Sequence, residues 1–511
     1  MAKADQGQPG VARIDRRAFL ASAVAAALPA AQPPSNVLFI LADQWRFSAF
    51  GHGGDPTVDT PAFDRFAEQG ARFTRAYSAN PVCTPNRSCI LTGRYSHQHG
   101  MIYNNIMLPP GERCVAEPFA KAGYATHYIG KWHMDGGQKP GFVPPGWRRR
   151  GFQTFEGFNR GHYYPIGAQY FTDQGELLKP DAYEPTYQTD LAIAFMKRNQ
   201  SRPFYCYLSW GPPHSPYRPP GEWDRYDPAK LDFRPNVPAP LRNDRQYRRS
   251  VAGYYGSCSA LDHEFSRLMR ALDDNGLANN TLVVFSADHG DMLGSHGCYI
   301  KSKPEEESLH IPLFMRLPAR IRAKQKIGAP ASSIDLAPTI LSLCGLGPLP
   351  NSPGRDLSAA LLKGQDPKTD FVYAQGAMSR GSQAPGGRKL ARGRKAADED
   401  GPNGPHGVSG GIKWRAFVTP SHKLVVRIDN TIGALFDLEK DPYELNNLAG
   451  TRPAAALEKD LLARMRQWAK QTGDPFPNLS QAARPMYSDQ EAAPPAPSPG
   501  APKSGAAKRG A

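Results

Sequence analysis

The chain has 511 residues, 40% of them hydrophobic, so it can bury a large core and is long enough for two or three domains. Its seven cysteines are odd in number, scattered and without a C-x-x-C pair, which excludes a zinc knuckle, a redox dithiol and a disulfide framework. Part of the formal net charge of +15 comes from residues 379–412 and the last residues, where a solvated basic segment is the simpler explanation, but a basic enzyme would also attract anionic substrates. Nucleic-acid binding has little support, because zinc-finger spacing and aromatic-basic RNA motifs are both missing.

The N-terminal segment, residues 1–31, has the features of an export address. Arg16-Arg17 precedes a short alanine-rich apolar run and small residues near Ala30, where a signal peptidase can cut. This pattern resembles a bacterial twin-arginine signal; the alternative is an N-terminal helix with two surface arginines. No later segment is long and apolar enough to cross a bilayer. We therefore expect a soluble mature protein, periplasmic or secreted, delivered by the twin-arginine export machinery.

Four apolar runs that end in polar residues indicate strands of a parallel sheet. Two amphipathic stretches, residues 60–70 and 256–276, read as helices between them. This alternation predicts an α/β fold over residues 35–370, with a large, mostly parallel mixed sheet flanked by helices. Ligands of such sheets bind at the carboxyl ends of the strands, where the polar residues stand. The runs are NVLFILADQ (36–44), YATHYIGKWH (124–133), FYCYLSWGPPH (204–214) and TLVVFSADHGD (281–291).

The C-terminal part differs in composition. Short strands between turn residues, followed by a helix over about 454–472, predict a smaller α+β domain over residues 371–485. Within it, residues 379–412 are rich in Gly, Pro and Arg and predict a flexible insertion. Residues 486–511 have the composition of a disordered tail.

Cys83 stands at the predicted start of a helix. Thr84 can cap that helix, Pro85 suits its first position, and Gly93 can end it. The free amides of a helix N-terminus favour anions, and Arg87 adds a positive charge one turn further on. A thiolate nucleophile is therefore possible at Cys83, and a buried structural cysteine is the competing interpretation.

A longer motif around this cysteine resembles the signature of the type I sulfatases, which belong to the alkaline phosphatase superfamily. The motif, C-x-P-x-R-x-x-x-x-T-G, is present as Cys83, Pro85, Arg87, Thr92 and Gly93. The resemblance implies an alkaline phosphatase/sulfatase-like fold. It also implies that a formylglycine maturation enzyme oxidises Cys83 to formylglycine, whose hydrated aldehyde is the nucleophile.

The resemblance also implies a divalent metal ion held by residues that follow two of the predicted strands. The ligands would be Asp43, Gln44, Asp288 and His289. Three oxygen donors suit a hard ion, so Ca²⁺ is expected first, with Mg²⁺ as an alternative. Many sulfatases have Asp and Asn in place of Gln44 and His289, and an imidazole ligand makes Mn²⁺ a further alternative.

Positively charged and histidine side chains complete the implied site. In similar enzymes the residues at the positions of Lys131 and Lys301 hold the sulfate, and the one at His133 hydrogen-bonds the formylglycine hydroxyl. His214 would protonate the leaving alcohol, and Arg87 would stabilise the developing charge. His97, His99 and His296 are left unassigned. Residues 137–187 form either pocket walls or an ordinary surface loop.

These observations predict a sulfuric ester hydrolase acting on a small-molecule or glycan sulfate ester, such as a sulfated carbohydrate or an aryl sulfate. A phosphonate monoester or phosphodiester hydrolase of the same superfamily is the first alternative, because sulfate and phosphate esters share a tetrahedral shape. The second alternative is a non-catalytic protein that binds sulfated glycans and keeps Cys83 as a thiol.

Overall fold

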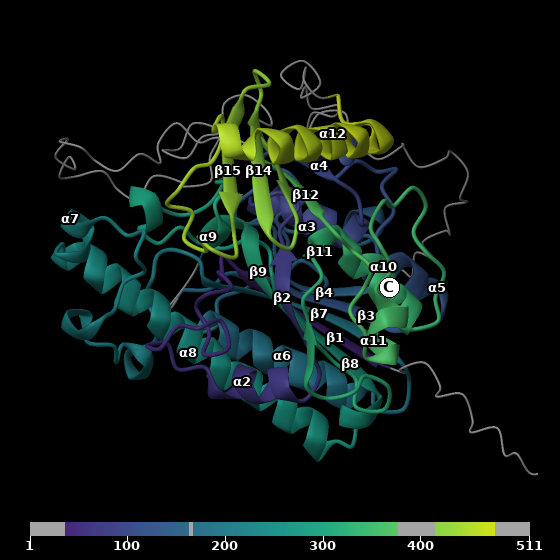
Figure 1. The fold of residues 1–511 in the computed structure, drawn as a ribbon. Helices are drawn as coiled ribbons and strands as arrows, with labels where there is room; N and C mark the ends of the chain where they lie inside the picture. The colour runs from purple at the N-terminus through teal and green to yellow at the C-terminus, as the bar shows by residue number, and fades with distance from the viewer. Residues whose placement is uncertain (1–35, 163–166, 377–413, 476–511) are drawn as a thin grey trace, which may run out of the picture. The chain divides into compact units, whose positions relative to one another are not determined.

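The computed structural model describes residues 36–162, 167–376 and 414–475 (Figure 1). The predicted export signal (1–31), insertion (379–412) and tail (486–511) lie outside the described residues. None of the described helices combines the length and the apolar character needed to span a bilayer.

The described part of the chain contains an 11-stranded mixed sheet in the order β10-β2-β9-β8-β1-β7-β3-β4-β5-β6, with β11 paired to β2. Its centre, from β8 to β4, is parallel, whereas β9 runs antiparallel between β8 and β2. The predicted α/β fold class is therefore confirmed. The strands are β1 (Asn36–Asp43), β2 (Ala71–Tyr77), β3 (Ala125–Lys131), β4 (Thr154–Phe158), β5 (Tyr170–Phe171), β6 (Leu177–Leu178), β7 (Phe204–Pro213), β8 (Thr281–Ala287), β9 (His310–Arg316), β10 (Gln325–Ile327) and β11 (Ala331–Ser332).

Strand β1 lies at the centre of this sheet, and every one of its residues is buried. A strand covered on both faces reads as a continuous apolar run, which is why residues 36–42 show almost no alternation. The register pairs Ala42 with Ala287 of β8 and Asp43 with Pro213 of β7. The residues that follow these three strands therefore emerge at one edge of the sheet.

Helices cover both faces of the sheet. Helices α2 (Pro61–Glu68), α6 (Glu184–Arg198) and α8 (Arg245–Asp274) pack together on one face (Figure 1). Helix α8 begins eleven residues before the predicted start, because the Asp244 side chain caps it by accepting a hydrogen bond from the Tyr247 amide. On the other face lie α3 (Cys83–Thr92), α5 (Ala116–Lys121), α10 (Leu336–Leu343) and α11 (Ser358–Lys363). The shorter helices are α4 (Ser96–His99), α7 (Ala239–Arg242) and α9 (Glu306–Leu309).

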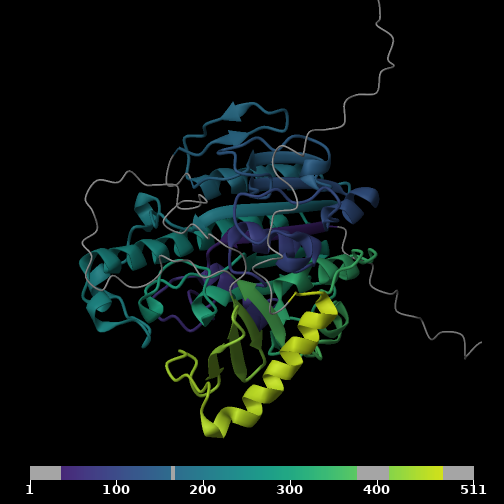
Figure 2. The same cartoon turned by 90° about the horizontal axis from the view of Figure 1, so that it is seen from above.

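A second, antiparallel sheet forms the C-terminal part, and helix α12 (Ala455–Thr472) runs along it (Figures 1 and 2). This helix matches the prediction over about 454–472. Tyr77 and Leu309 of the large sheet region share one apolar cluster with Trp414 of the small sheet. The strands are β12 (Val372–Gly376), β13 (Trp414–Val418), β14 (His422–Arg427) and β15 (Ile432–Asp437). The first strand of this antiparallel sheet begins at Val372.

Candidate active site

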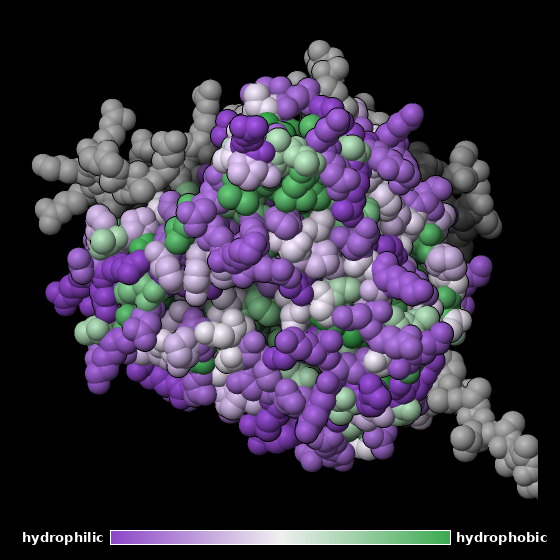
Figure 3. Space-filling model, in the orientation of Figure 1, coloured by the Kyte–Doolittle hydropathy of each residue, from purple (hydrophilic) through white to green (hydrophobic). Residues whose placement is uncertain are grey.

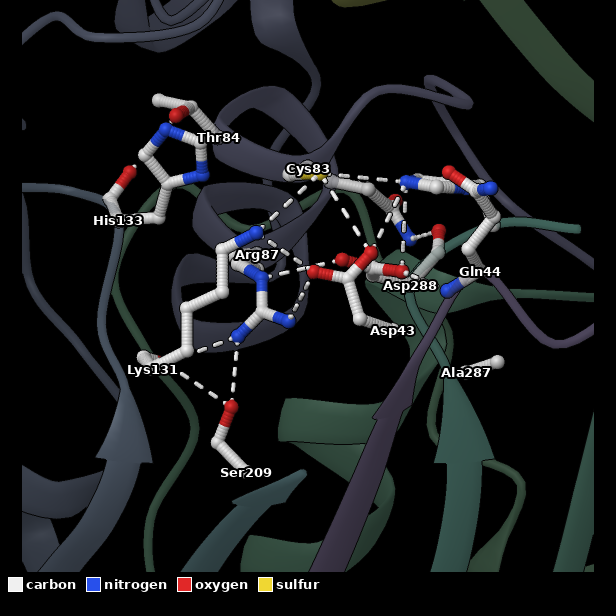
Figure 4. Close-up of polar contacts among 12 residues, drawn as sticks. Asp43, Gln44, Cys83, Thr84, Arg87, Lys131, His133, Ser209, Ala287 and Asp288 are labelled. Carbon is white, nitrogen blue, oxygen red and sulfur yellow. Dashed lines mark hydrogen bonds and ion pairs between the residues drawn. The ribbon is translucent and has the colours of Figure 1, made fainter. Parts of the chain in front are cut away.

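Polar side chains from segments far apart in the sequence meet around the sulfur of Cys83 (Figure 4). Asp43 ends β1 and Gln44 follows it, Lys131 ends β3, and Asp288 follows β8. These side chains and Cys83 are fully buried. The site therefore lies at the carboxyl edge of the parallel strands, as the α/β pattern predicts.

Helix α3 begins earlier than the sequence suggests. Its N-cap is Val82, whose carbonyl accepts the first intrahelical hydrogen bond from Asn86 at 2.9 Å, so Cys83 is already the first helical residue. The prediction that Thr84 caps the helix was wrong: its hydroxyl donates instead to the carbonyl of His133 at 2.7 Å. Gly93 ends the helix in the left-handed region, with φ of 67°, as predicted.

The thiol of Cys83 is surrounded by charged groups and by an imidazole. Its Sγ lies 2.9 Å from Lys301 Nζ, 3.3 Å from His289 Nε2 and 3.8 Å from Lys131 Nζ. Burial and the negative charge of Asp43 raise the pKa of this thiol to about 12, against the opposing effect of the two lysines. The thiol is therefore protonated at neutral pH, which argues against the thiolate nucleophile that the helix N-terminus alone suggested.

The guanidinium of Arg87 forms ion pairs with two carboxylates, those of Asp43 and Asp288. Its Nη2 lies 3.1 Å from Asp43 Oδ2, and its Nε lies 3.0 Å from Asp288 Oδ2. Nη1 donates to Ser209 Oγ at 2.7 Å and to the carbonyl of Lys131 at 2.9 Å. Burial alone would raise the pKa of Asp43, but the positive charges of Lys131 and Arg87 hold it well below its usual range. Asp43 is therefore ionised, and its charge lies beside Cys83.

The second oxygens of the two carboxylates face His289. Its Nε2 lies 3.6 Å from Asp43 Oδ1 and 3.5 Å from Asp288 Oδ1. Nδ1 lies 2.9 Å from the carbonyl of Gly290. A carbonyl only accepts, so Nδ1 carries the proton and the Nε2 lone pair points at the carboxylates.

Gln44 adds an amide oxygen to this group. Its Nε2 donates to Asp291 Oδ2 at 2.8 Å, while its buried Oε1 has no hydrogen-bond partner among the described residues. Its backbone takes a φ of 67°, an uncommon value for a residue other than glycine, and its amide donates to Asp288 Oδ1 at 3.1 Å. An unpaired buried acceptor beside two carboxylates and an imidazole fits a cation, since a group of this kind is costly without a partner. One ligand atom from each of Asp43, Cys83, Asp288 and His289 also lies within 4.8 Å of the others, as a metal centre requires.

Two histidines and two lysines form the other side of the site. His214 Nδ1 lies 2.7 Å from the carbonyl of Ser215, and its Nε2 lies 2.8 Å from Lys301 Nζ. Burial, followed by the charges of His162 and Lys301, holds the pKa of His214 well below its usual range. The imidazole of His214 is therefore neutral at pH 7 and accepts a hydrogen bond from the Lys301 ammonium.

The structure brings in residues that the sequence analysis did not assign. The ring of His162 stacks on that of His214 at a centroid distance of 3.7 Å, and its Nε2 lies 3.3 Å from Lys131 Nζ. His162 falls within residues 137–187, where the sequence predicts only pocket walls or a surface loop. Asp291 orients Gln44 by accepting a hydrogen bond from its side chain. In the sequence, only its position three residues after Asp288 indicated that Asp291 could belong to the site.

The remaining predicted and unassigned residues lie further out. The ring of His133 contacts Asn105 Oδ1 at 2.9 Å, and its carbonyl binds Thr84, next to Cys83. The three histidines left unassigned make polar contacts outside the group of residues around Cys83. His97 lies 3.1 Å from the carbonyl of Thr472, His99 accepts from the amide of Met101, and His296 contacts Asn236.

The matching family model and two curated relatives point to one family. The family model named Sulfatase matches residues 35–346. The chain is 32% identical to the "Ulvan-active sulfatase" of Formosa agariphila, over 86% of this chain and 82% of that protein. It is 29% identical to the "Endo-4-O-sulfatase" of Bacteroides thetaiotaomicron, over 86% and 93% of the two chains. A solved Bacteroides thetaiotaomicron structure, described under the metabolism of multiple glycosaminoglycans, superposes with a TM-score of 0.75 at 25% identity, over 89% of this chain and 100% of its own.

Proposed function

The chain belongs to the sulfatase family and is an enzyme that hydrolyses sulfate esters, and we propose that it removes sulfate from a carbohydrate through a formylglycine made from Cys83. The observation that carries this proposal is the convergence of Lys131, Lys301 and Arg87 on the neighbourhood of one buried cysteine. A binding protein has no need of a nucleophile position enclosed in this way. This arrangement therefore argues against the non-catalytic alternative.

The charges around position 83 suit an anionic substrate. Asp43 and Asp288 contribute two negative charges, against three positive charges from Arg87, Lys131 and Lys301. A bound divalent cation would increase this positive excess. A sulfate ester carries one negative charge, and charge develops further on its oxygens as the ester bond breaks, so preorganised cations stabilise the transition state.

We assign the cation to Asp43, Gln44, Asp288 and His289, because each presents an oxygen or nitrogen lone pair toward the others. The three oxygens favour Ca²⁺, with Mg²⁺ and Mn²⁺ as the other candidates. When bound, such a cation supplies Lewis-acid polarisation of a sulfate oxygen. Arg87 acts through these ligands: by taking Oδ2 of both carboxylates it turns both Oδ1 atoms toward His289.

The side chains around position 83 have separable tasks in this reaction. The hydrated aldehyde of formylglycine supplies two hydroxyls, one to displace the alcohol from sulfur and one to release the sulfate by re-forming the aldehyde. Lys131 and Lys301 are placed to hold sulfate oxygens, as both contact the Cys83 sulfur. His214 accepts a hydrogen bond from Lys301, so a proton for the departing alcohol is available from this pair.

The choice of a carbohydrate sulfate is supported by the names of the relatives. The two curated sulfatases described above are named for ulvan and for an endo-4-O-sulfatase activity. An enzyme that acts on such polymers outside the cell must be exported. We infer export from the twin-arginine pattern at Arg16-Arg17.

The activity is tested by comparing kcat/KM for 4-nitrophenyl sulfate with that for 4-nitrophenyl phenylphosphonate on one preparation. We expect the sulfate to be hydrolysed with a kcat/KM at least about tenfold higher, a difference of about 1.4 kcal/mol in transition-state stabilisation. A preference for the phosphonate would instead select the phosphonate monoester hydrolase alternative. Both assays release the same nitrophenolate, so the leaving group is matched.

Cation binding is expected to persist at pH 5. Burial lowers the pKa of His289 to about 4, so its imidazole stays neutral and able to bind a metal until the pH falls through that value. Thermal unfolding of protein stripped with EDTA should therefore shift to higher Tm on adding Ca²⁺ at pH 7 and at pH 5, and lose this shift below about pH 4.

The matched control is His289→Asn, which keeps a ligand atom and removes the titrating group. Its Ca²⁺-dependent Tm shift should extend to lower pH than that of the native protein. A shift that disappears near pH 6.5 in the native protein, the usual pKa range of histidine, would contradict the assignment.

A further inference from the structure

A cleft of about 830 Å³ lies between the large sheet, the loop after β1 and the C-terminal sheet, and the face in Figure 3 is hollowed beneath that sheet. Its described lining does not include the residues around Cys83. Arg46, Arg72, Arg75, Arg234 and Lys326 provide five permanent cations. We refer to it as the Arg46 cleft.

The carboxylates of the Arg46 cleft already have partners. Glu306 pairs with Lys423 at 3.0 Å, and Glu307 pairs with Arg234 at 3.0 Å. Asp366 accepts a hydrogen bond from the amide of Gly328 at 2.8 Å. Arg234 and Lys423 thus compensate the charges of Glu306 and Glu307, and the other cations of the cleft are not needed for this.

Four cations of the cleft have no carboxylate within salt-bridge distance among the described residues. Arg72 and Lys326 stand at matched positions on the neighbouring strands β2 and β10. These two strands are parallel, and the like charges on them repel each other, so an anion between them would reduce that repulsion. Arg75 donates a hydrogen bond to the carbonyl of Gly328 at 3.2 Å. Arg46, the fourth, is the most unusual.

Arg46 is only 3% exposed, yet its Nε and Nη1 have no hydrogen-bond partner among the described residues. Buried guanidinium groups are normally paired with carboxylate or phosphate, because desolvated charge is expensive. Arg46 also packs against the metal-ligand loop: a Cβ added to Gly290 would lie 3.1 Å from its Cβ. Two donor nitrogens of Arg46, a residue of the cleft lining, are therefore unpartnered among the described residues, close to the loop that carries His289.

Aromatic rings form part of the cleft wall. Phe47 stacks on His310 with a centroid distance of 3.9 Å, and Tyr77 stacks on the same imidazole at 5.0 Å. His310 Nε2 is a further buried atom with no partner among the described residues. Flat rings beside cations and polar groups suit a sugar ring that carries acidic substituents.

We propose that the Arg46 cleft is an accessory subsite for a sulfate or carboxylate group of a polyanionic glycan, different from the sulfate hydrolysed at position 83. This inference rests on the proposed function, since it assumes a glycan substrate. It predicts that the enzyme recognises a chain with at least two anionic groups. A free inorganic anion such as sulfate carries the same charged group as the glycan but has no sugar ring attached to it.

The test measures binding by isothermal titration calorimetry in the Cys83→Ala background, where turnover cannot interfere. The probes are dextran sulfate oligosaccharides, uncharged dextran and inorganic sulfate. Adding Arg75→Ala and Lys326→Ala is expected to raise the Kd for dextran sulfate about tenfold, equivalent to about 1.4 kcal/mol. Uncharged dextran should not bind, and inorganic sulfate should bind equally to both proteins.

The matched control carries Lys197→Ala and Arg270→Ala, which remove two exposed charges outside the cleft lining. Equal weakening by the two pairs would overturn the proposal, because the binding would then follow net charge alone. Loss of inorganic sulfate binding in the cleft variant would also overturn it, in favour of a site for a free ion. Unchanged melting temperatures show that the variants fold. Failure of the proposed function would appear separately, in the nitrophenyl ester assay with Cys83 intact.

Discussion

Replacing Cys83 with alanine is expected to lower kcat/KM for 4-nitrophenyl sulfate by at least about 10⁴-fold, the scale seen when a covalent nucleophile is removed. The residue lies at the centre of the site, with Lys301, His289 and Lys131 within 3.8 Å of its sulfur. Alanine removes the precursor of the formylglycine and leaves these groups without a nucleophile. The measurement is steady-state hydrolysis, with a melting curve to confirm folding.

The control is Cys89→Ala in the same helix. Cys89 is also buried, but its sulfur contacts Ser96 Oγ and His99 Nε2, outside the site, so this variant should keep its activity. Mass spectrometry of the peptide containing residue 83 must accompany the assay. Conversion to formylglycine exchanges the sulfur for an oxygen and removes two hydrogens. Full activity in protein whose residue 83 is entirely thiol would contradict the formylglycine proposal.

Replacing Arg87 with methionine is expected to lower the free energy of unfolding by about 3–5 kcal/mol in metal-free protein. Methionine has similar length but no charge, so Asp43 and Asp288 would lose the guanidinium that binds both. Two buried carboxylates with fewer positive partners are strongly destabilising. Denaturant unfolding in EDTA measures the loss, and adding Ca²⁺ should reduce it, because the cation offsets the same two charges.

The matched control is Arg65→Met on the exposed side of α2, where the expected change is within about 0.5 kcal/mol. A loss below about 1 kcal/mol for Arg87→Met would show that the pair of carboxylates does not depend on the guanidinium. An equal loss with and without Ca²⁺ would argue against a cation between Asp43 and Asp288.

Much of the fold could be predicted because its signals are local. Strand β1 reads as an apolar run since it is covered on both faces, and helix α12 was found within a residue at its start. Gly93 was assigned correctly because a left-handed helix end favours glycine in any surroundings. The start of α8 was missed, since the apolar pattern used to find it does not extend to the cap at Asp244.

The protein's own sequence determined which residues stand at the strand ends, because hydrophobic patterning ends where a strand does, and it carried the motif around Cys83. Only the tertiary structure decided how those residues act. Gln44 is oriented by Asp291, 247 residues away, and His162 is brought onto His214 by folding. The protonation of the Cys83 thiol was likewise decided by burial and by Asp43, not by its helix. Burial and contacts between distant segments exist only in the folded chain, so no local pattern encodes them.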